Sequence, residues 1–135
     1  MRQATVDLIN RYYAAFNAGD MPAFLGMLTE DVAHDVNQGG RETGKRAFAA
    51  FMQRMNRSYK EEIVDITVMT NEAGSRAAAE FTVLGKYLVT DEGLPEASGQ
   101  TYRLPAGAFF EIRGGQVARV TNYYNLPDWI AQVGG

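Results

Sequence analysis

The sequence contains no cysteine and only one histidine, His34, among its 135 residues. The lack of cysteine excludes disulfides, thiolate metal sites and cysteine nucleophiles, and one histidine cannot build a multi-histidine metal centre. No apolar run approaches the roughly 20 residues that span a bilayer, and the start, MRQATVDLIN, lacks the apolar core of a secretory signal. We therefore expect a cytoplasmic protein whose chemistry uses oxygen-bearing side chains and one imidazole, without a metal or other cofactor.

Excess positive charge is also missing, because 13 Lys and Arg stand against 16 Asp and Glu, a formal charge of −3. Nucleic-acid phosphates and anionic membranes attract basic proteins, so neither is an expected partner. Hydrophobic residues make up 46% and charged residues 21%, the balance of a soluble globular protein. Because domains commonly contain about 100–150 residues, the chain fits one domain over residues 1–135.

The first 60 residues show a helical period. Apolar side chains between residues 6 and 16 share one half of a helical wheel, which predicts an amphipathic helix. Gly19 can end this helix, and Asp20 can cap a short second helix with Pro22 in its first turn. A third helix is indicated by an i, i+3, i+4, i+7 pattern formed by Phe48, Phe51, Met52 and Met55.

A short strand is predicted between the second and third helices. Residues 31–37 alternate, with Val32, His34 and Val36 on one face and Asp35 on the other. This alternation places His34 on the same half-buried face as two valines. The following residues, 39–46, fit a loop and the start of the third helix.

The helical period disappears after residue 59. Runs typical of strands cover residues 61–70, 75–89, 100–112 and 116–125, and the short breaks at 71–74 and 113–115 fit hairpins. Pro127 and Asp128 can begin a short terminal helix. Helices followed by a run of strands predict an α+β fold, with about three N-terminal helices packed on one face of an antiparallel sheet.

Two stretches carry a family resemblance. NRYYAAFNAGD, residues 10–20, resembles the first helix of ketosteroid isomerases, and the order of elements resembles the NTF2-like superfamily. GLPEASGQTYRLPAGAFFEIRGGQVARVTNYY, residues 93–124, resembles the closing strands of SnoaL-like proteins, which include polyketide cyclases. The resemblance implies a curved sheet and helices that form a cone with an internal pocket. Because this superfamily contains several enzyme classes and non-catalytic proteins, the site residues must decide the function.

The isomerase resemblance implies a role for Tyr12, near the centre of the first helix's apolar face. It corresponds to the tyrosine that donates a hydrogen bond to the substrate oxyanion, although a core tyrosine would show the same pattern. The isomerase carboxylate corresponds to Val36, one residue after Asp35. Either a bulge turns Asp35 inward, or His34 supplies the pocket group. We favour His34, because it already shares the parity of Val36, and burial lowers the pKa of an imidazole, which suits a neutral base at pH 7.

Other positions depart from the family patterns. The second oxyanion donor of the isomerases corresponds to Gly107 or Ala108, and neither side chain can donate a hydrogen bond. The acid/base aspartate of SnoaL-like cyclases corresponds to Asn122, which can orient a carbonyl or a water, or make a structural hydrogen bond. Glu80 is a reserve acid if it is buried, and an ordinary surface residue if it faces solvent.

The candidate pocket lining is apolar and consists of Phe16, Met52, Met55 and Tyr124, although the same pattern fits an ordinary core. These residues predict a small apolar or polycyclic carbonyl ligand. Tyr12 would polarise the carbonyl, His34 or Asp35 would abstract the α-proton, and Asn122 would orient the reacting group.

Two non-catalytic functions stay open beside this enzyme. They are a ligand-binding or carrier module, which the loss of both family carboxylates favours, and a scaffold subunit. We also expect a homodimer through the outer face of the sheet. Val117, Thr121 and Tyr123 alternate away from Asn122 and would otherwise be partly exposed.

Overall fold

The computed structural model describes residues 1–37 and 39–134. Within these residues the elements follow the order α1 (Arg2–Ala18), α2 (Met21–Gly26), β1 (Leu28–Asp35), β2 (Arg41–Thr43) and α3 (Lys45–Ser58), and then β3 (Tyr59–Thr70), β4 (Arg76–Tyr87), β5 (Thr101–Arg113), β6 (Gln116–Tyr124) and α4 (Leu126–Gly134). The expected α+β class is confirmed, and three helices precede the long strands.

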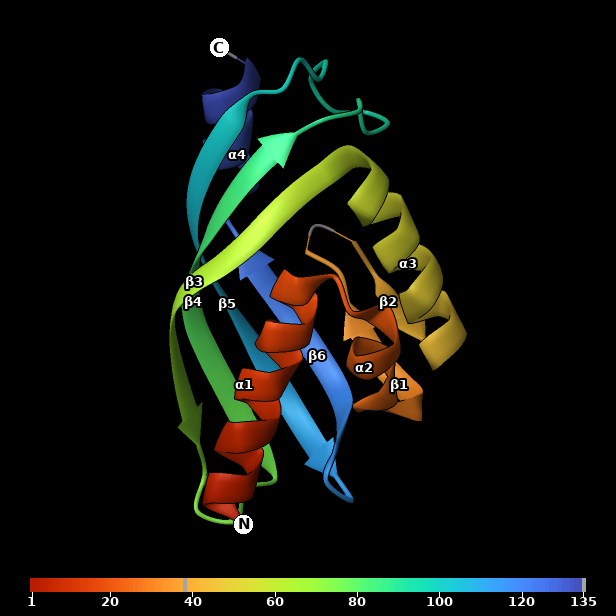
Figure 1. Ribbon diagram of the computed structural model, residues 1–135, viewed down its shortest axis with the longest axis vertical. Helices are drawn as coiled ribbons and strands as arrows, with labels where there is room; N and C mark the ends of the chain where they lie inside the picture. The colour runs from red at the N-terminus through yellow and green to blue at the C-terminus, as the bar shows by residue number, and fades with distance from the viewer. Residues whose placement is uncertain (38, 135) are drawn as a thin grey trace.

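The strands form one six-stranded sheet in the order β2-β1-β6-β5-β4-β3. The prediction of a wholly antiparallel sheet is wrong at one pair, because β1 runs parallel to β6. No hairpin joins these two strands, so no local turn sets their relative direction. Helix α1 lies across the sheet, α3 lies beside β1 and β2, and β3 crosses in front at the upper end (Figure 1).

The ends of the first two helices follow their sequence signals. Gly19 adopts a left-handed conformation with φ 68°, and its N–H bonds to the carbonyl of Phe16. Asp20 then accepts a hydrogen bond at 3.2 Å from the N–H of Ala23. A glycine has no Cβ to oppose this conformation, and an aspartate satisfies a free helix N–H group. These two residues therefore separate α1 from α2 within two positions.

The long strands agree closely with the predicted runs, whereas the first strand does not. It covers residues 28–35 instead of 31–37, because Leu28 pairs with Val117 of β6. Strand β2 was expected to be a loop. Its three residues alternate too briefly to be recognised, and they become a strand because they pair with β1, where Glu42 lies opposite His34.

The sheet is bent by an irregularity in β3 between Val64 and Thr67. Asp65 lies there with φ 55°, a left-handed conformation that non-glycine residues rarely adopt. A bulge increases local twist and bends the strand that carries it. The upper half of β3 consequently turns across the sheet towards α3 (Figure 1).

The core lies between the inner face of the sheet and the helices. Tyr12 of α1 contacts Phe110 of β5, and Trp129 of α4 contacts Tyr87 of β4. The outward orientation predicted for Val117 is wrong, since its side chain is fully buried. A bulge between Glu111 and Ile112 in the β5–β6 pairing shifts the alternation at that point.

Candidate functional site

His34 lies on the inner face of β1 and is only 2% exposed. Its imidazole stacks on the ring of Phe48, with centroids 4.1 Å apart and planes 7° apart, and meets the ring of Phe51 edge-on at 4.6 Å. Both phenylalanines come from the apolar stripe of α3. Burial lowers the pKa of His34, which the charges of Glu42 and Asp35 partly oppose. The imidazole is therefore a neutral group at pH 7.

The two nitrogens of this imidazole differ in their contacts. Nε2 lies 3.4 Å from the side-chain nitrogen of Asn122, and buried Nδ1 has no hydrogen-bond partner in the described part of the chain. The β1–β6 pairing sets His34 opposite Val120, two residues before Asn122, so Asn122 shares the inner face. With the Asn122 amide as donor, Nε2 is the acceptor and the ring hydrogen sits on Nδ1.

Tyr12 belongs to the same aromatic cluster as His34. Its ring lies 4.6 Å from that of Phe24, which lies 5.6 Å from Phe48, the stacking partner of His34. Burial raises the pKa of Tyr12 far above its ordinary value, so its hydroxyl stays protonated and can donate a hydrogen bond. Tyr13, beside it, is also buried, and its hydroxyl has no partner among residues 1–37 and 39–134.

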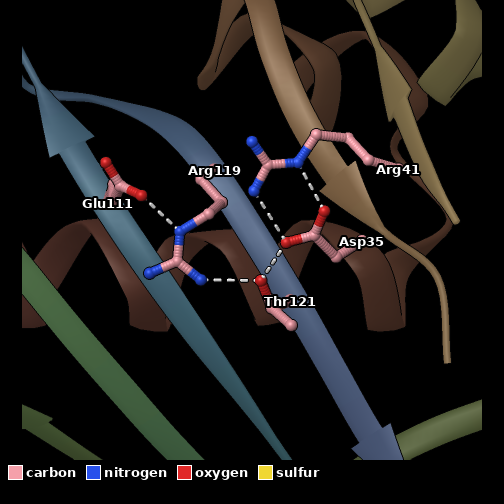
Figure 2. Close-up of polar contacts among 5 residues, drawn as sticks. All are labelled: Asp35, Arg41, Glu111, Arg119 and Thr121. Carbon is pink, nitrogen blue, oxygen red and sulfur yellow. Dashed lines mark hydrogen bonds and ion pairs between the residues drawn. The ribbon is translucent and has the colours of Figure 1, made fainter.

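Asp35 faces the opposite side of the sheet from His34. Its carboxylate accepts hydrogen bonds from Arg41, at 2.6 and 3.1 Å, and from the Thr121 hydroxyl at 2.6 Å. Arg119 extends this outer network by bonding both Thr121 and Glu111 (Figure 2). Arg41, followed by Thr121, lowers the pKa of Asp35 to about 2. No bulge turns Asp35 inward, and the strand alternation leaves His34 as the inner group.

Glu80 is also absent from the neighbourhood of His34. It is exposed on the outer face of β4, opposite Thr67 and Gly107 in the two flanking strands. Its sequence context, AAAEFTVLG, fitted either face because small alanines can lie on both sides of a sheet. Glu80 is therefore an ordinary surface residue and not a buried acid.

The predicted lining residues have different degrees of burial. Met52 is buried in the core, Phe16 and Met55 are half-buried, and Tyr124 is 38% exposed at the end of β6. The backbone of Tyr124 is bonded to the side chain of Asn37. Two hollows lie on the described chain near the strands, and none of these four residues lines either of them.

The larger hollow, about 700 Å³, lies across β3, β4 and β5 and includes Glu61, Gly85 and Tyr102. The smaller hollow, about 270 Å³, lies between the β2 region and α3 and includes Glu42, Phe51 and Arg54. It is the one beside the candidate site, because Phe51 contacts His34 and Glu42 is its partner across β1 and β2. One layer of side chains thus separates this hollow from the imidazole.

Sequence reasoning missed one acidic group, Glu61. The Tyr102 hydroxyl donates to its Oε2 at 2.5 Å, and burial raises its pKa above the ordinary value against the lowering effect of this hydrogen bond. Two features of the sequence could have indicated it. Glu61 has the same parity as buried Ile63, and Gly85, in the neighbouring strand, marks a place where another group approaches the backbone closely.

No three His, Asp or Glu side chains among residues 1–37 and 39–134 gather closely enough to hold a metal ion. None of the helices described above is both long enough and apolar enough to cross a membrane.

The class of protein follows from this fold and from a match to a family model. The model of the SnoaL-like domain matches residues 9–120, and the chain belongs to this family. A structure from Pseudomonas putida KT2440, called a "putative polyketide cyclase", is 68% identical, with a TM-score of 0.94 over 96% of this chain and 97% of that one.

Two further structures extend the comparison. One from Xanthomonas campestris pv. campestris, with the same name, is 60% identical, with a TM-score of 0.94 over 97% of each chain. An NTF2-like protein from Burkholderia xenovorans LB400 is 17% identical, with a TM-score of 0.79 over 98% of each chain, and shares the fold. No functionally curated protein matches the sequence significantly.

Proposed function

We propose that this SnoaL-like protein binds a small, largely apolar carbonyl or polycyclic compound and moves a proton on it without a cofactor. The observation that carries the proposal is the environment of His34, a buried imidazole whose burial lowers its pKa and whose Nε2 faces the amide of Asn122. A neutral imidazole is suited to act as a general base near pH 7, and its Nε2 lone pair is freed for the substrate when the Asn122 amide turns to the reacting group.

In the proposed reaction, Nε2 of His34 takes the proton α to the substrate carbonyl, and the C–H electron pair moves into an enolate. The Tyr12 hydroxyl donates a hydrogen bond to the enolate oxygen, and the Asn122 amide orients the reacting group. The imidazolium then returns the proton to the substrate. Each step uses groups of the chain itself, and the proton count balances.

The ligand class is supported by the surroundings of His34 and by the relatives. Phe48 and Phe51 present aromatic rings on two sides of the imidazole, and such rings favour flat, apolar ligands. Two relatives at 68% and 60% identity carry a polyketide cyclase name, which fits a polycyclic ketone.

Exchange of α-hydrogens with solvent deuterium tests the proposed step. With 1-tetralone as substrate, we expect exchange whose kcat/KM rises with pH through the pKa of free His34, and we expect His34→Gln to abolish that rise. Tyr12→Phe should slow exchange about 10²-fold or more with little change in affinity, because the lost hydrogen bond strengthens as charge develops. Glu80→Gln, on the outer face, is the matched control and should not change the rate.

Binding without exchange would support the second candidate, a non-catalytic carrier. The position of Asp35 and Glu80 on the outer face favours it, because neither of these two predicted carboxylates lies on the His34 side of the sheet. If wild type and all three variants bind 1-tetralone equally and none exchanges its hydrogens, the carrier function replaces the enzyme.

We also propose that two copies associate through the outer face of the sheet. Phe109 and Tyr123 are 49% and 57% exposed there, and their rings contact each other at 5.8 Å. The neighbouring outer network carries two acidic and two basic side chains, so the face can meet a copy of itself without net repulsion. An exposed aromatic pair on a balanced surface is typical of an interface.

A further inference from the structure

Two buried polar atoms on facing side chains lack a hydrogen-bond partner within residues 1–37 and 39–134. They are Nδ1 of His34 and Oε1 of Glu42. The β1–β2 register places these residues directly opposite each other, so their side chains project from the same face. Directly opposed residues in an antiparallel pair have Cβ atoms about 4.5–5.5 Å apart. Because a buried polar group without a partner is costly, two of them on facing side chains favour a small polar group that bonds to both.

The other carboxylate oxygen of Glu42, Oε2, has a charged neighbour. Oε2 lies 3.9 Å from a terminal nitrogen of Arg54, on α3, and the Arg54 guanidinium lies 5.6 Å above the ring of Phe51. Oε1 is the buried oxygen of the pair. The hollow of about 270 Å³ is lined by Glu42, Phe51 and Arg54, so space for a small group adjoins this carboxylate.

We propose that a hydroxyl group, of a bound water or of the ligand, bridges Nδ1 of His34 and Oε1 of Glu42, and that Glu42 is the positioning residue for His34. A hydroxyl can accept the Nδ1–H hydrogen bond and donate its own hydrogen to a carboxylate, so one group satisfies both atoms. The inference rests on the proposed function, and it assigns a hydroxyl-recognising subsite to the same site.

This bridge has a consequence for proton transfer at the opposite nitrogen. A hydrogen bond at Nδ1 fixes the tautomer in which Nε2 carries the lone pair. When Nε2 takes a proton, the ring becomes positive, and the bridged carboxylate stabilises that charge. Glu42 thereby acts on the substrate through His34 and does not itself need to touch the substrate.

Among the charged groups near His34, Glu42 is the one that can serve this subsite. On β1, Asp35 projects to the other face and is paired with Arg41. On α3, the positive charge of Arg54 is directed at Glu42. On β6, the facing side chain is the uncharged amide of Asn122. The charge of Glu42 opposes the lowering of the His34 pKa by burial, as the proposed bridge requires.

The test uses the fact that His34 is the sole histidine, so its ring signals in ¹⁵N-histidine-labelled protein need no further assignment. In the free protein we expect the Nδ1–H tautomer, and we expect Glu42→Gln to lower the His34 titration midpoint by about one pH unit. Glu42→Asp keeps the charge but moves it back by one methylene, so a smaller shift is expected. Glu80→Gln is the control and should leave the midpoint unchanged.

Binding of 1-tetralone and its 5-hydroxy analogue identifies the source of the bridging hydroxyl. If the ligand supplies it, the analogue binds about tenfold more tightly, and Glu42→Gln removes that advantage. If water supplies it, both compounds bind equally while the titration shift persists, and the bridge is again supported. An unchanged His34 midpoint and tautomer in Glu42→Gln would overturn the bridge. Because the titration needs no substrate, this failure differs from a failure of the catalytic proposal, which is loss of hydrogen exchange.

Discussion

The ring of Tyr102 on β5 lies against the backbone of Gly85 on β4 and brings its hydroxyl within 2.5 Å of Glu61 on β3, two strands away. The sheet register sets Gly85 between these residues, opposite Glu61 on β3 and opposite Tyr102 on β5. A Cβ on Gly85 would lie 2.1 Å from Cζ of Tyr102. The tyrosine can therefore reach across β4 only because that position has no side chain.

We expect Gly85→Ala to destabilise the protein by about 1–3 kcal/mol, because the added methyl group must displace the Tyr102 ring or the strand backbone. Alanine in a strand is otherwise slightly favoured over glycine, so the sign of the effect is specific to this contact. Urea denaturation measures the change. Gly40→Ala, where an added Cβ meets no atom within 4 Å, is the control and should alter stability by less than about 0.5 kcal/mol. A stabilised Gly85→Ala protein would contradict the close contact.

The Glu61 carboxyl should make stability fall as pH rises. Burial raises its pKa in the folded protein, so folding favours the protonated form, and this contribution is fully present below the ordinary pKa and is lost above the folded one. We therefore expect Glu61→Gln to gain stability relative to wild type as pH rises from about 4.5 towards neutrality.

Thermal or urea unfolding at several pH values checks this expectation. The matched control is Glu62→Gln, which removes an exposed carboxylate from the next position of the same strand. A stability difference between Glu61→Gln and wild type that is independent of pH would show that Glu61 is solvated in the folded protein.

Asp35 should have the opposite effect from Glu61, because its contribution to stability increases as pH rises. Its pKa is about 2 in the folded protein, below the ordinary 3.8, so its contribution is present above pH 3.8 and is lost as pH falls towards 2. We expect a double-mutant cycle of Asp35→Asn and Arg41→Gln to give a coupling of up to about 1 kcal/mol at pH 7, since the Arg41 side chain is 54% exposed to screening solvent.

Asp35→Asn also tests which side chain is the general base in the proposed reaction. Because Asp35 faces away from His34, Asp35→Asn should leave the rate of α-hydrogen exchange unchanged. A loss of exchange comparable to that of His34→Gln would place Asp35 in the reaction and contradict this assignment.

Self-association should depend on the exposed aromatic pair of the outer face. We expect sedimentation at micromolar concentration to give a mass near twice the 14.9 kDa of the chain, and Tyr123→Lys to reduce it to that of one chain. Introducing a positive charge at the centre of an apolar contact opposes its burial. Arg57→Glu, on the exposed side of α3, is the control. A wild-type mass of one chain at all concentrations would exclude the dimer.

The sequence by itself determined the elements whose signals are local. The apolar period defines the helices, and a glycine followed by an aspartate separates α1 from α2. The alternation of Val32, His34 and Asp35 was enough to put His34 on the buried side of its strand. These features depend on neighbours a few positions away, and the sequence displays such neighbours directly.

Only the tertiary structure decided which distant residues meet. Asn122 reaches His34 because β1 pairs in parallel with a strand more than 80 residues later, and no turn encodes that pairing. Glu42 lies opposite His34 on β2, which is a strand only because β1 lies beside it. The bulge between Val117 and Arg119 likewise reverses a face that alternation alone assigns outward. Strand pairing and bulges depend on the whole sheet, because its hydrogen bonds join backbone groups that all residues share.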